Sequence, residues 1–227
     1  MSLYRDQGIV VRTWKLGEAD RIIVIITEDN GKVRVVAKGV RKTRSKFGGR
    51  LEPTSHVALQ LFRGKSDLGI VTQAETIDRF QNIRSNPDLF SDASSMLEVV
   101  DHVAPDESPD PIRYKMLLGA LRTLDEKSPP LLVPAFFLKL LDHEGLAPEL
   151  GFCVKCLDTE NLVSISVSEG GVFCIKCKRG KSISDTSIAV MRAILGGALN
   201  QALEVEDSKT ISEIDRIASE AVEFHLE

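Results

Sequence analysis

The chain has 227 residues, which is enough for one large or two small domains, and its composition of 43% apolar and 27% charged residues is that of a folded globular protein. This composition excludes an intrinsically disordered chain. The longest apolar run, residues 131–138 with a proline inside it, is too short to span a membrane. The net charge of −4 hides an asymmetry, because residues 1–80 carry 15 Lys and Arg against 9 Asp and Glu, whereas residues 81–227 carry 14 against 24. We therefore expect the first part to face a polyanion.

The first residues, MSLYRD, lack the apolar core of a secretion signal. Together with the absence of a long apolar run, this predicts a soluble cytoplasmic protein that does not associate with membranes. In that compartment thiols stay reduced, so the four cysteines are not expected to form disulfides.

Five runs rich in β-branched and aromatic residues occupy residues 1–80. The second run is almost wholly apolar, which is typical of a central strand, and Asp29-Asn30-Gly31 is a hairpin signal between the second and third. A turn at residues 63–65 separates the last two. The five runs are Gly8–Trp14, Arg21–Thr27, Lys32–Ala37, His56–Phe62 and Leu68–Ala74. Five short strands predict a small barrel, for which the OB-fold is the first candidate; the spacing alone does not separate it from an SH3-like barrel.

The segment from Lys32 to Arg50 contains eight basic residues and no acidic residue. Its first third continues a strand, and the glycines at 39, 48 and 49 predict a loop for the remainder. A polycationic loop that follows a strand is suited to binding a phosphate backbone, although a solvated, partly disordered loop is the alternative. The predicted nucleic-acid contacts are Arg34, Lys38, Arg41, Lys42, Arg44, Lys46, Phe47 and Arg50.

Aromatic side chains are the second requirement of an OB-fold that binds single strands, because they stack on bases. Tyr4, Trp14, Phe47 and Phe62 are available. For Trp14 and Phe62, packing within the barrel is at least as good an explanation. Phe47 lies between a lysine and a glycine in a polar loop, where core packing explains it less easily, and it is therefore the predicted stacking residue.

Helical patterns begin after residue 80. Asn86 can cap a helix that has Pro87 at its first position, and helical periodicity resumes at Ile112 after a break rich in proline and acidic residues. A further helix over Leu131 to His143 is apolar on nearly every side, which predicts a place at the centre of a helical bundle.

The four cysteines follow the pattern C-x2-C-x17-C-x2-C. Two close pairs at this spacing are typical of a structural zinc ribbon, with a hairpin between residues 162 and 172; free thiols or a redox pair are the alternatives. The predicted ligands of one structural Zn²⁺ are Cys153, Cys156, Cys174 and Cys177. All four coordination positions would be filled by protein, so no position stays open for a catalytic water.

Basic residues crowd the same module, and they have two explanations. They either contact nucleic acid or offset the charge of −2 that Zn²⁺ and four thiolates carry together. The residues are Lys155, Lys176, Lys178, Arg179 and Lys181.

Two more helices are expected after the ribbon. Ser184 can cap the first, and Thr210 to Glu213 has the pattern of a capping box for the second. If these helices rejoin the bundle, the ribbon at about residues 150–182 is an insertion in a helical domain of residues 81–227.

Taken together, these motifs resemble the RecO family of bacterial recombination mediators in their order and spacing. The matching segments are Gly8-Ile-Val-Val, Leu16-Gly-Glu-Ala-Asp20, Gly31-Lys-Val, Ala37-Lys-Gly-Val-Arg41, Gly49-Arg-Leu-Glu-Pro53, Leu138-Lys-Leu-Leu, Gly145-Leu-Ala-Pro-Glu-Leu150 and Gly170-Gly-Val-Phe-Cys174. The resemblance implies an α+β protein with an N-terminal OB-fold of five strands, followed by a helical domain that bears a zinc ribbon. One departure is that relatives run slightly further past a His-Leu pair like His225-Leu226.

The same resemblance implies a function. It implies binding of single- and double-stranded DNA, at the nucleoid, and annealing of complementary strands. It also implies partnership with RecR and single-stranded DNA-binding protein in loading RecA. An alternative is a zinc-ribbon adaptor that binds nucleic acid without annealing.

An enzyme is not expected, and no small-molecule substrate is indicated. There is no phosphate-binding loop of the Walker type, and His143-Glu144 begins like a zinc-protease motif but has Ala147 at the second histidine position. Asp207 and Lys209 have a nuclease-like spacing, yet they precede a helix cap rather than lying on a strand. No constellation of nucleophile and base stands out.

Overall fold

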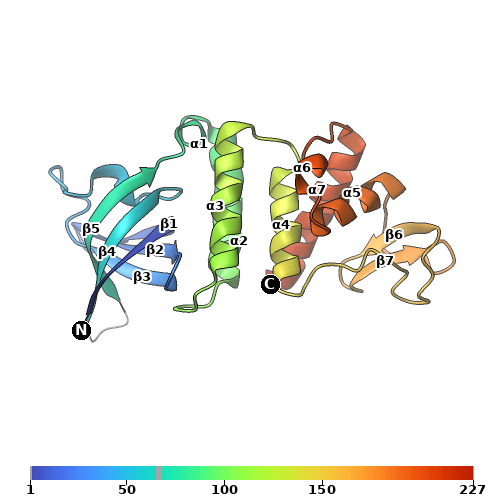
Figure 1. The fold of residues 1–227 in the computed structure, drawn as a ribbon, viewed down its shortest axis with the longest axis horizontal. Helices are drawn as coiled ribbons and strands as arrows, with labels where there is room; N and C mark the ends of the chain where they lie inside the picture. Colours follow the sequence, from blue (N-terminus) through green and yellow to red (C-terminus); the bar gives the residue numbers. More distant parts are fainter. Residues whose placement is uncertain (1, 65–67, 227) are drawn as a thin grey trace. The chain divides into compact units, whose positions relative to one another are not determined.

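The structure, a computed structural model, describes residues 2–64 and 68–226 and is an α+β protein, as predicted (Figure 1). It divides into two compact units, Met1–Lys127 and Ser128–Glu227. The turn expected at residues 63–65 lies partly outside the described residues.

Five strands of the first unit close into a barrel in the order β1-β2-β3-β5-β4. Neighbouring strands are antiparallel except β3 and β5, which pair in parallel and close the barrel in the OB-fold arrangement, so that prediction is confirmed. The strands are β1 (Ser2–Leu16), β2 (Asp20–Thr27), β3 (Gly31–Ala37), β4 (His56–Arg63) and β5 (Gly69–Asp78).

β1 is longer than the sequence predicted, because it serves two neighbours. Its first half pairs with β4 from Ser2 to Ile9, and its second half pairs with β2 up to Leu16. A register shift between Val10 and Arg12 lies near the change of partner, and such a bulge bends a strand and alters which side chains face inward.

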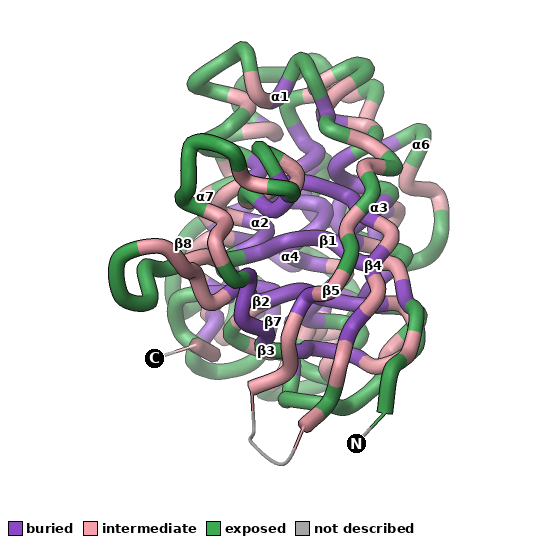
Figure 2. The backbone as a smooth tube through the Cα atoms, turned by 90° about the vertical axis from the view of Figure 1, so that its left-hand side faces the viewer, coloured by how far each residue is buried: buried purple, intermediate pink, exposed green. Residues whose placement is uncertain are grey.

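The barrel interior is filled by alternate residues of its strands. Ile23 and Ile25 of β2, and Val33 and Val35 of β3, lie within the buried apolar cluster at its centre. Residues of the opposite alternation, such as Val24, are also buried, as expected for a strand covered on both sides. Figure 2 shows this burial in the central stretches of β1, β2 and β3, with exposed residues in the connecting loops.

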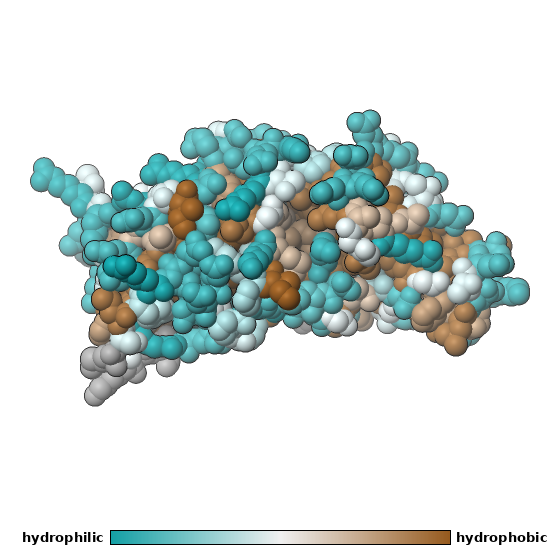
Figure 3. Space-filling view, in the orientation of Figure 1, coloured by the Kyte–Doolittle hydropathy of each residue, from teal (hydrophilic) through white to brown (hydrophobic). Residues whose placement is uncertain are grey.

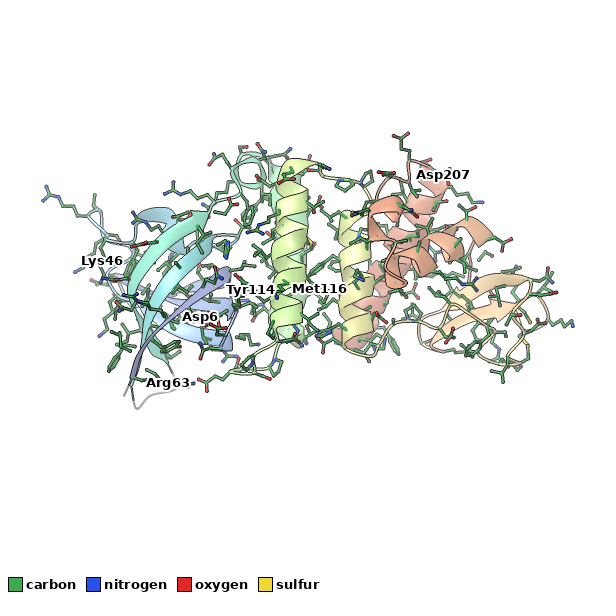
Figure 4. The ribbon with its side chains drawn as sticks, viewed as in Figure 1. Asp6, Lys46, Arg63, Tyr114, Met116 and Asp207 are labelled. Carbon is green, nitrogen blue, oxygen red and sulfur yellow. The ribbon has the colours of Figure 1, made fainter. Side chains whose placement is uncertain are left out.

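Three helices complete the first unit, and α2 packs against β1. Asn86 caps α2 through its side-chain oxygen, which accepts hydrogen bonds from the N–H groups of Asp88 and Leu89, as predicted. The elements are α1 (Gln81–Ser85), α2 (Pro87–Val103) and α3 (Pro111–Glu126), and a short 3-10 helix, η1 (Gly48–Leu51), lies in the basic segment. Tyr114 of α3 points toward the barrel (Figure 4), where its hydroxyl lies 2.8 Å from Nε2 of the buried His56.

The segment between α2 and α3 is joined to the β2–β3 hairpin. The ammonium of Lys32 lies 3.6 Å from a carboxylate oxygen of Asp101 and 3.5 Å from one of Asp106, and Lys32 is only 7% exposed. The backbone N–H of Glu107 donates to the carbonyl of Lys32 at 2.9 Å. Gly31 has a φ of +68°, and a Cβ there would lie 2.2 Å from the carbonyl oxygen of Ser108. The hairpin and the segment are therefore packed backbone to backbone.

The second unit is a small helical bundle with a three-stranded sheet inserted between α4 and α5, which matches the predicted ribbon. α4 packs against α5 and α7, and the sheet has the order β7-β6-β8. The elements are α4 (Leu132–His143), β6 (Leu162–Ser166), β7 (Gly171–Cys174), β8 (Lys181–Ser182), α5 (Asp185–Leu195), α6 (Leu199–Ala202) and α7 (Ser208–Leu226).

The capping box predicted for the last helix is wrong. α7 begins at Ser208, and it is Asp207 whose carboxylate accepts the N–H of Thr210 at 2.8 Å. The carboxylate of Glu213 instead accepts hydrogen bonds from Ser184 and Ser187 at the start of α5, which attaches α5 to α7. Across the part of the chain that the structure describes, no helix has the length and apolarity needed to cross a bilayer.

Candidate nucleic-acid interface and metal centre

The basic segment leaves β3 at Ala37 as a loop that is attached to the barrel at several points. The N–H of Gly39 donates to the carboxylate of Asp20 at 2.7 Å, and the N–H of Arg41 donates to the carbonyl of Ala19 at 3.0 Å. Further along, the ring of Phe47 is buried in the barrel core. These attachments hold the loop against the β1–β2 turn and over the barrel.

Three cations of this loop are anchored by neutral carbonyl groups. Arg41 donates to the carbonyl of Glu18 at 2.9 Å, Lys46 donates to that of Thr72 at 2.9 Å, and Arg50 donates to that of Phe47 at 3.1 Å. Because carbonyl oxygens carry no net charge, these bonds position the cations without neutralising them.

Three other loop cations, Lys38, Lys42 and Arg44, are exposed, and their side chains make no hydrogen bond or ion pair within residues 2–64 and 68–226. Nor do the anchored cations form an ion pair with any described carboxylate. The loop therefore presents six positive charges that form no ion pair with a carboxylate of the described residues. Figure 4 shows Lys46 on the side of the barrel away from α2 and α3, and Figure 3 shows a mostly hydrophilic surface over the barrel.

Arg34 differs from the other predicted contacts. It lies on β3 itself, and its guanidinium is 3.1 Å from a carboxylate oxygen of Asp106, which offsets its charge. Asp106 lies 72 positions further along the chain, so the basic segment alone gave no sign of this pairing.

Phe47 is not available to stack on a base, so this prediction is wrong. Its side chain is 1% exposed and packs with Leu51 and Val71 in the barrel core. The ammonium of Lys46 also lies 4.9 Å from the centre of the ring. The loop folds back over the barrel and inserts its one aromatic residue there, which the polar neighbours in the sequence do not reveal.

Trp14 is an exposed aromatic residue that the sequence did not single out as a binding residue. Packing within the barrel was at least as good an explanation for it, but the structure leaves it 40% exposed. It pairs with Ile22, whose neighbour Ile23 faces the interior, so Trp14 lies on the outside. The bulge at Val10 and Arg12 shifts the alternation, and no pattern in the sequence marks it.

The four cysteines come together as predicted. Their sulfur atoms all lie within 4.8 Å of one another, and Cys156 and Cys174 are 3.6 Å apart. A tetrahedral ion with bonds of about 2.3 Å needs sulfur atoms about 3.8 Å apart, so the group has the size of a metal centre. Cys153 begins one tight turn, closed by the N–H of Leu157 donating to its carbonyl, and Cys174 at the end of β7 begins the other, closed by the N–H of Cys177.

The thiols of this centre differ in acidity. Burial raises the pKa of Cys153, but hydrogen bonds from backbone groups at Cys174, Cys156 and Lys155 outweigh it and bring the pKa to about 6. The neighbouring Cys156 sulfur, followed by burial, raises the pKa of Cys177 to about 12. The Cys153 thiolate therefore forms readily, whereas deprotonation of Cys177 is opposed by the neighbouring sulfur atoms. A cation bound between the sulfurs would reduce the repulsion between the thiolates.

Two of the five basic residues near the cysteines have acidic partners. Arg179 pairs with Glu169 at 3.3 Å, and Lys181 pairs with Glu220 at 2.8 Å. The side chains of Lys155, Lys176 and Lys178 are exposed and form no ion pair or hydrogen bond in the described part of the chain, so they can contact nucleic acid or offset the charge of the metal centre.

The remaining candidate sites have structural explanations. Asp207 caps α7, which accounts for its nuclease-like distance from Lys209, and hydrogen bonding to Thr210 lowers the pKa of Asp207. His143 and Glu144 end α4. Within the described residues, the four cysteines are the one group of three or more His, Cys, Asp or Glu side chains close enough to hold a metal ion.

Comparison with known proteins agrees with the geometry over the whole chain. The family model described as "Recombination protein O N terminal" matches residues 1–80, and "Recombination protein O C terminal" matches residues 84–227. The chain is 37% identical to the DNA repair protein RecO of Cutibacterium acnes and 39% identical to that of Streptomyces coelicolor, and in both cases the match covers 100% of this chain and 96% of the relative. It is 38% identical to the RecO of Thermobifida fusca, covering 100% and 95%. With a barrel, a helical bundle and a cysteine centre matched from end to end, this chain belongs to the RecO family of DNA repair proteins.

Proposed function

We propose that this chain is a non-enzymatic recombination mediator that binds single- and double-stranded DNA and anneals complementary strands. With RecR, it helps to load RecA onto DNA that is coated by single-stranded DNA-binding protein. The observation that carries the proposal is a loop on an OB-fold barrel whose six cations form no ion pair with any described carboxylate. Family membership supports it, since the relatives are named DNA repair proteins.

The chemistry of annealing explains why such a loop is sufficient. Two DNA strands repel each other through their phosphates, and a surface that neutralises both lowers this repulsion. Arg41, Lys46 and Arg50 are held in place by carbonyl groups, so they can meet phosphates without first breaking an ion pair. No covalent step is required, and we propose no catalytic residue.

We propose a division of labour between residues 1–80, as the DNA-binding OB-fold, and residues 81–227, as a helical domain that carries the ribbon. The ion in the ribbon is proposed to be one structural Zn²⁺ held by the four cysteine thiolates. Its support is the cluster of four sulfur atoms within 4.8 Å, which fills a tetrahedral shell and leaves no place for a reacting water.

An annealing assay tests the proposal. Two complementary labelled oligonucleotides are mixed with and without the protein, without nucleotide, across a series of salt concentrations. We expect faster pairing that declines as salt rises, and the same protein should accelerate pairing of strands coated with single-stranded DNA-binding protein when RecR is present. Tight DNA binding with no acceleration under either condition would contradict the mediator and favour the adaptor that binds without annealing.

A further inference from the structure

The outer face of β1, β2 and β3 carries a row of apolar side chains next to a row of ion pairs. The strand register places Arg12, Val24 and Arg34 side by side, and both arginines are paired, Arg12 with Asp101 at 2.9 Å and Arg34 with Asp106. The next outward row consists of Trp14, Ile22 and Val36, of which Trp14 is 40% exposed, Ile22 is partly buried and Val36 is buried.

The indole of Trp14 has no partner in the described part of the chain. Its N–H makes no hydrogen bond there, and neither a cation nor another aromatic ring lies over it. Leu16, two positions further along the same face of β1, is 38% exposed. One exposed apolar residue is ordinary, but Trp14 and Leu16 exposed together on one face, with Ile22 partly exposed beside them, indicate a contact surface.

The basic loop is fastened to the hairpin that carries this row. Arg41 donates to the carbonyl groups of Gly17 and Glu18 in the β1–β2 turn, which directly follows Leu16. On the other side of the turn, Asp20 accepts the N–H of Gly39 at 2.7 Å. One hairpin therefore carries both an aromatic face and the attachment points of cations that can bind phosphates.

We propose that Trp14, with Leu16 and Ile22 beside it, is a stacking platform for an unpaired base of a strand whose phosphates Arg41 and its neighbours bind. This inference rests on the proposed function and names single-stranded nucleic acid as the ligand of this surface. In a duplex each base is covered by its neighbours, so its face is not accessible to an indole. An unpaired base has a free face, and stacking on an aromatic side chain is tolerant of sequence.

The protein as it exists provides the first test, because Trp14 is its only tryptophan. Oligo(dT) is titrated while indole emission and the anisotropy of a label on the oligonucleotide are both recorded. We expect emission to be quenched in step with binding, whereas a blunt duplex of equal length should bind with little quenching.

Variants supply the second test. Trp14→Ala should weaken oligo(dT) binding about 5- to 160-fold, the range for one stacked base, and leave the salt dependence unchanged because no charge is removed. Trp14→Phe should restore part of the affinity. The matched control is Phe90→Ala on α2. The Phe90 side chain is 41% exposed but lies outside the proposed platform, so its loss should change the affinity for neither oligo(dT) nor the duplex.

The outcomes separate the two proposals. Saturable binding without quenching, together with full affinity of Trp14→Ala, would overturn the platform and leave the DNA-binding function intact. Equal quenching by duplex and single strand would also overturn it. If the wild-type protein bound no oligonucleotide at low salt, the proposed function would fall, and the platform with it.

Discussion

Removing three exposed loop cations, which form no ion pair or side-chain hydrogen bond with any described residue, tests the interface with little risk to the fold. Lys38, Lys42 and Arg44 are exposed, and their side chains make no hydrogen bond or ion pair in the described part of the chain. Substituting all three with alanine should therefore change the free energy of unfolding by only about 0.5 kcal/mol per site or less. Any larger effect on DNA binding then reports a lost interaction with the ligand.

The size of the effect follows from counterion release. If all six loop cations meet phosphates of a single strand, the slope of log K against log salt concentration is about −4.2, at about 0.7 per contact. Three contacts removed bring the slope to about −2.1. Between 1 M and 0.1 M salt, a slope smaller by about 2.1 lowers the gain in the association constant by about two decades. The affinity of the variant at 0.1 M salt should therefore be about 100-fold lower than that of the wild-type protein.

The assay is fluorescence anisotropy of a labelled oligo(dT) at five or more salt concentrations. The matched control removes three exposed cations of the same compact unit from around α3, namely Lys115, Arg122 and Lys127. We expect the control to retain both slope and affinity. An unchanged slope in the loop variant, or an equal loss in the control, would show that the basic loop does not bind the phosphates.

Three further predictions concern stability and the metal. Cys153→Ser should abolish stoichiometric zinc, measured by elemental analysis, and lower the melting temperature while most oligo(dT) affinity persists; full zinc content would refute the assignment. Burial lowers the pKa of His56 in the folded state, so below about pH 6.5 the unfolded state binds a proton more readily than the folded state does. The contribution of His56 to the free energy of unfolding should therefore be complete above that pH and decline below it. In urea melts at pH 5 and 7.5, His56→Gln should flatten this dependence, and an unaltered dependence would assign it to another group. Gly31→Ala should cost more unfolding free energy than Gly17→Ala, since both have positive φ but only the former meets a backbone carbonyl, and equal costs would argue against the close packing.

Local patterns were sufficient for much of this molecule. The strand runs and turn residues predicted the barrel, because five β-type segments in about 75 residues have few ways to bury their apolar faces. The spacing of the cysteines predicted their cluster, since each C-x2-C pair occupies one tight turn and only the meeting of the two turns was left to tertiary structure.

What could not be predicted depends on contacts between distant residues or on an irregularity within a strand. The burial of Phe47 depends on the loop folding back over the barrel, and the exposure of Trp14 depends on a bulge in β1. Glu213 of α7 fits a capping pattern with Thr210, yet its carboxylate accepts hydrogen bonds from two serines at the start of a different helix, α5. For Phe47 and Glu213, a local preference was overridden by partners far along the chain, whereas for Trp14 it was overridden by an irregularity of its own strand.

The attachment of the β2–β3 hairpin to the segment after α2 determines where the chain can be truncated without exposing apolar side chains. Ile9, Val24 and Ile26 face away from the barrel interior and are nevertheless at most 3% exposed, and Lys32 has its counter-charges beyond residue 100. A fragment that ended at residue 80, where the first family segment ends, would present this apolar side to water and would be prone to aggregate. We therefore expect a stable fragment to include α1, α2 and α3 and to extend to about Lys127, where the first compact unit ends.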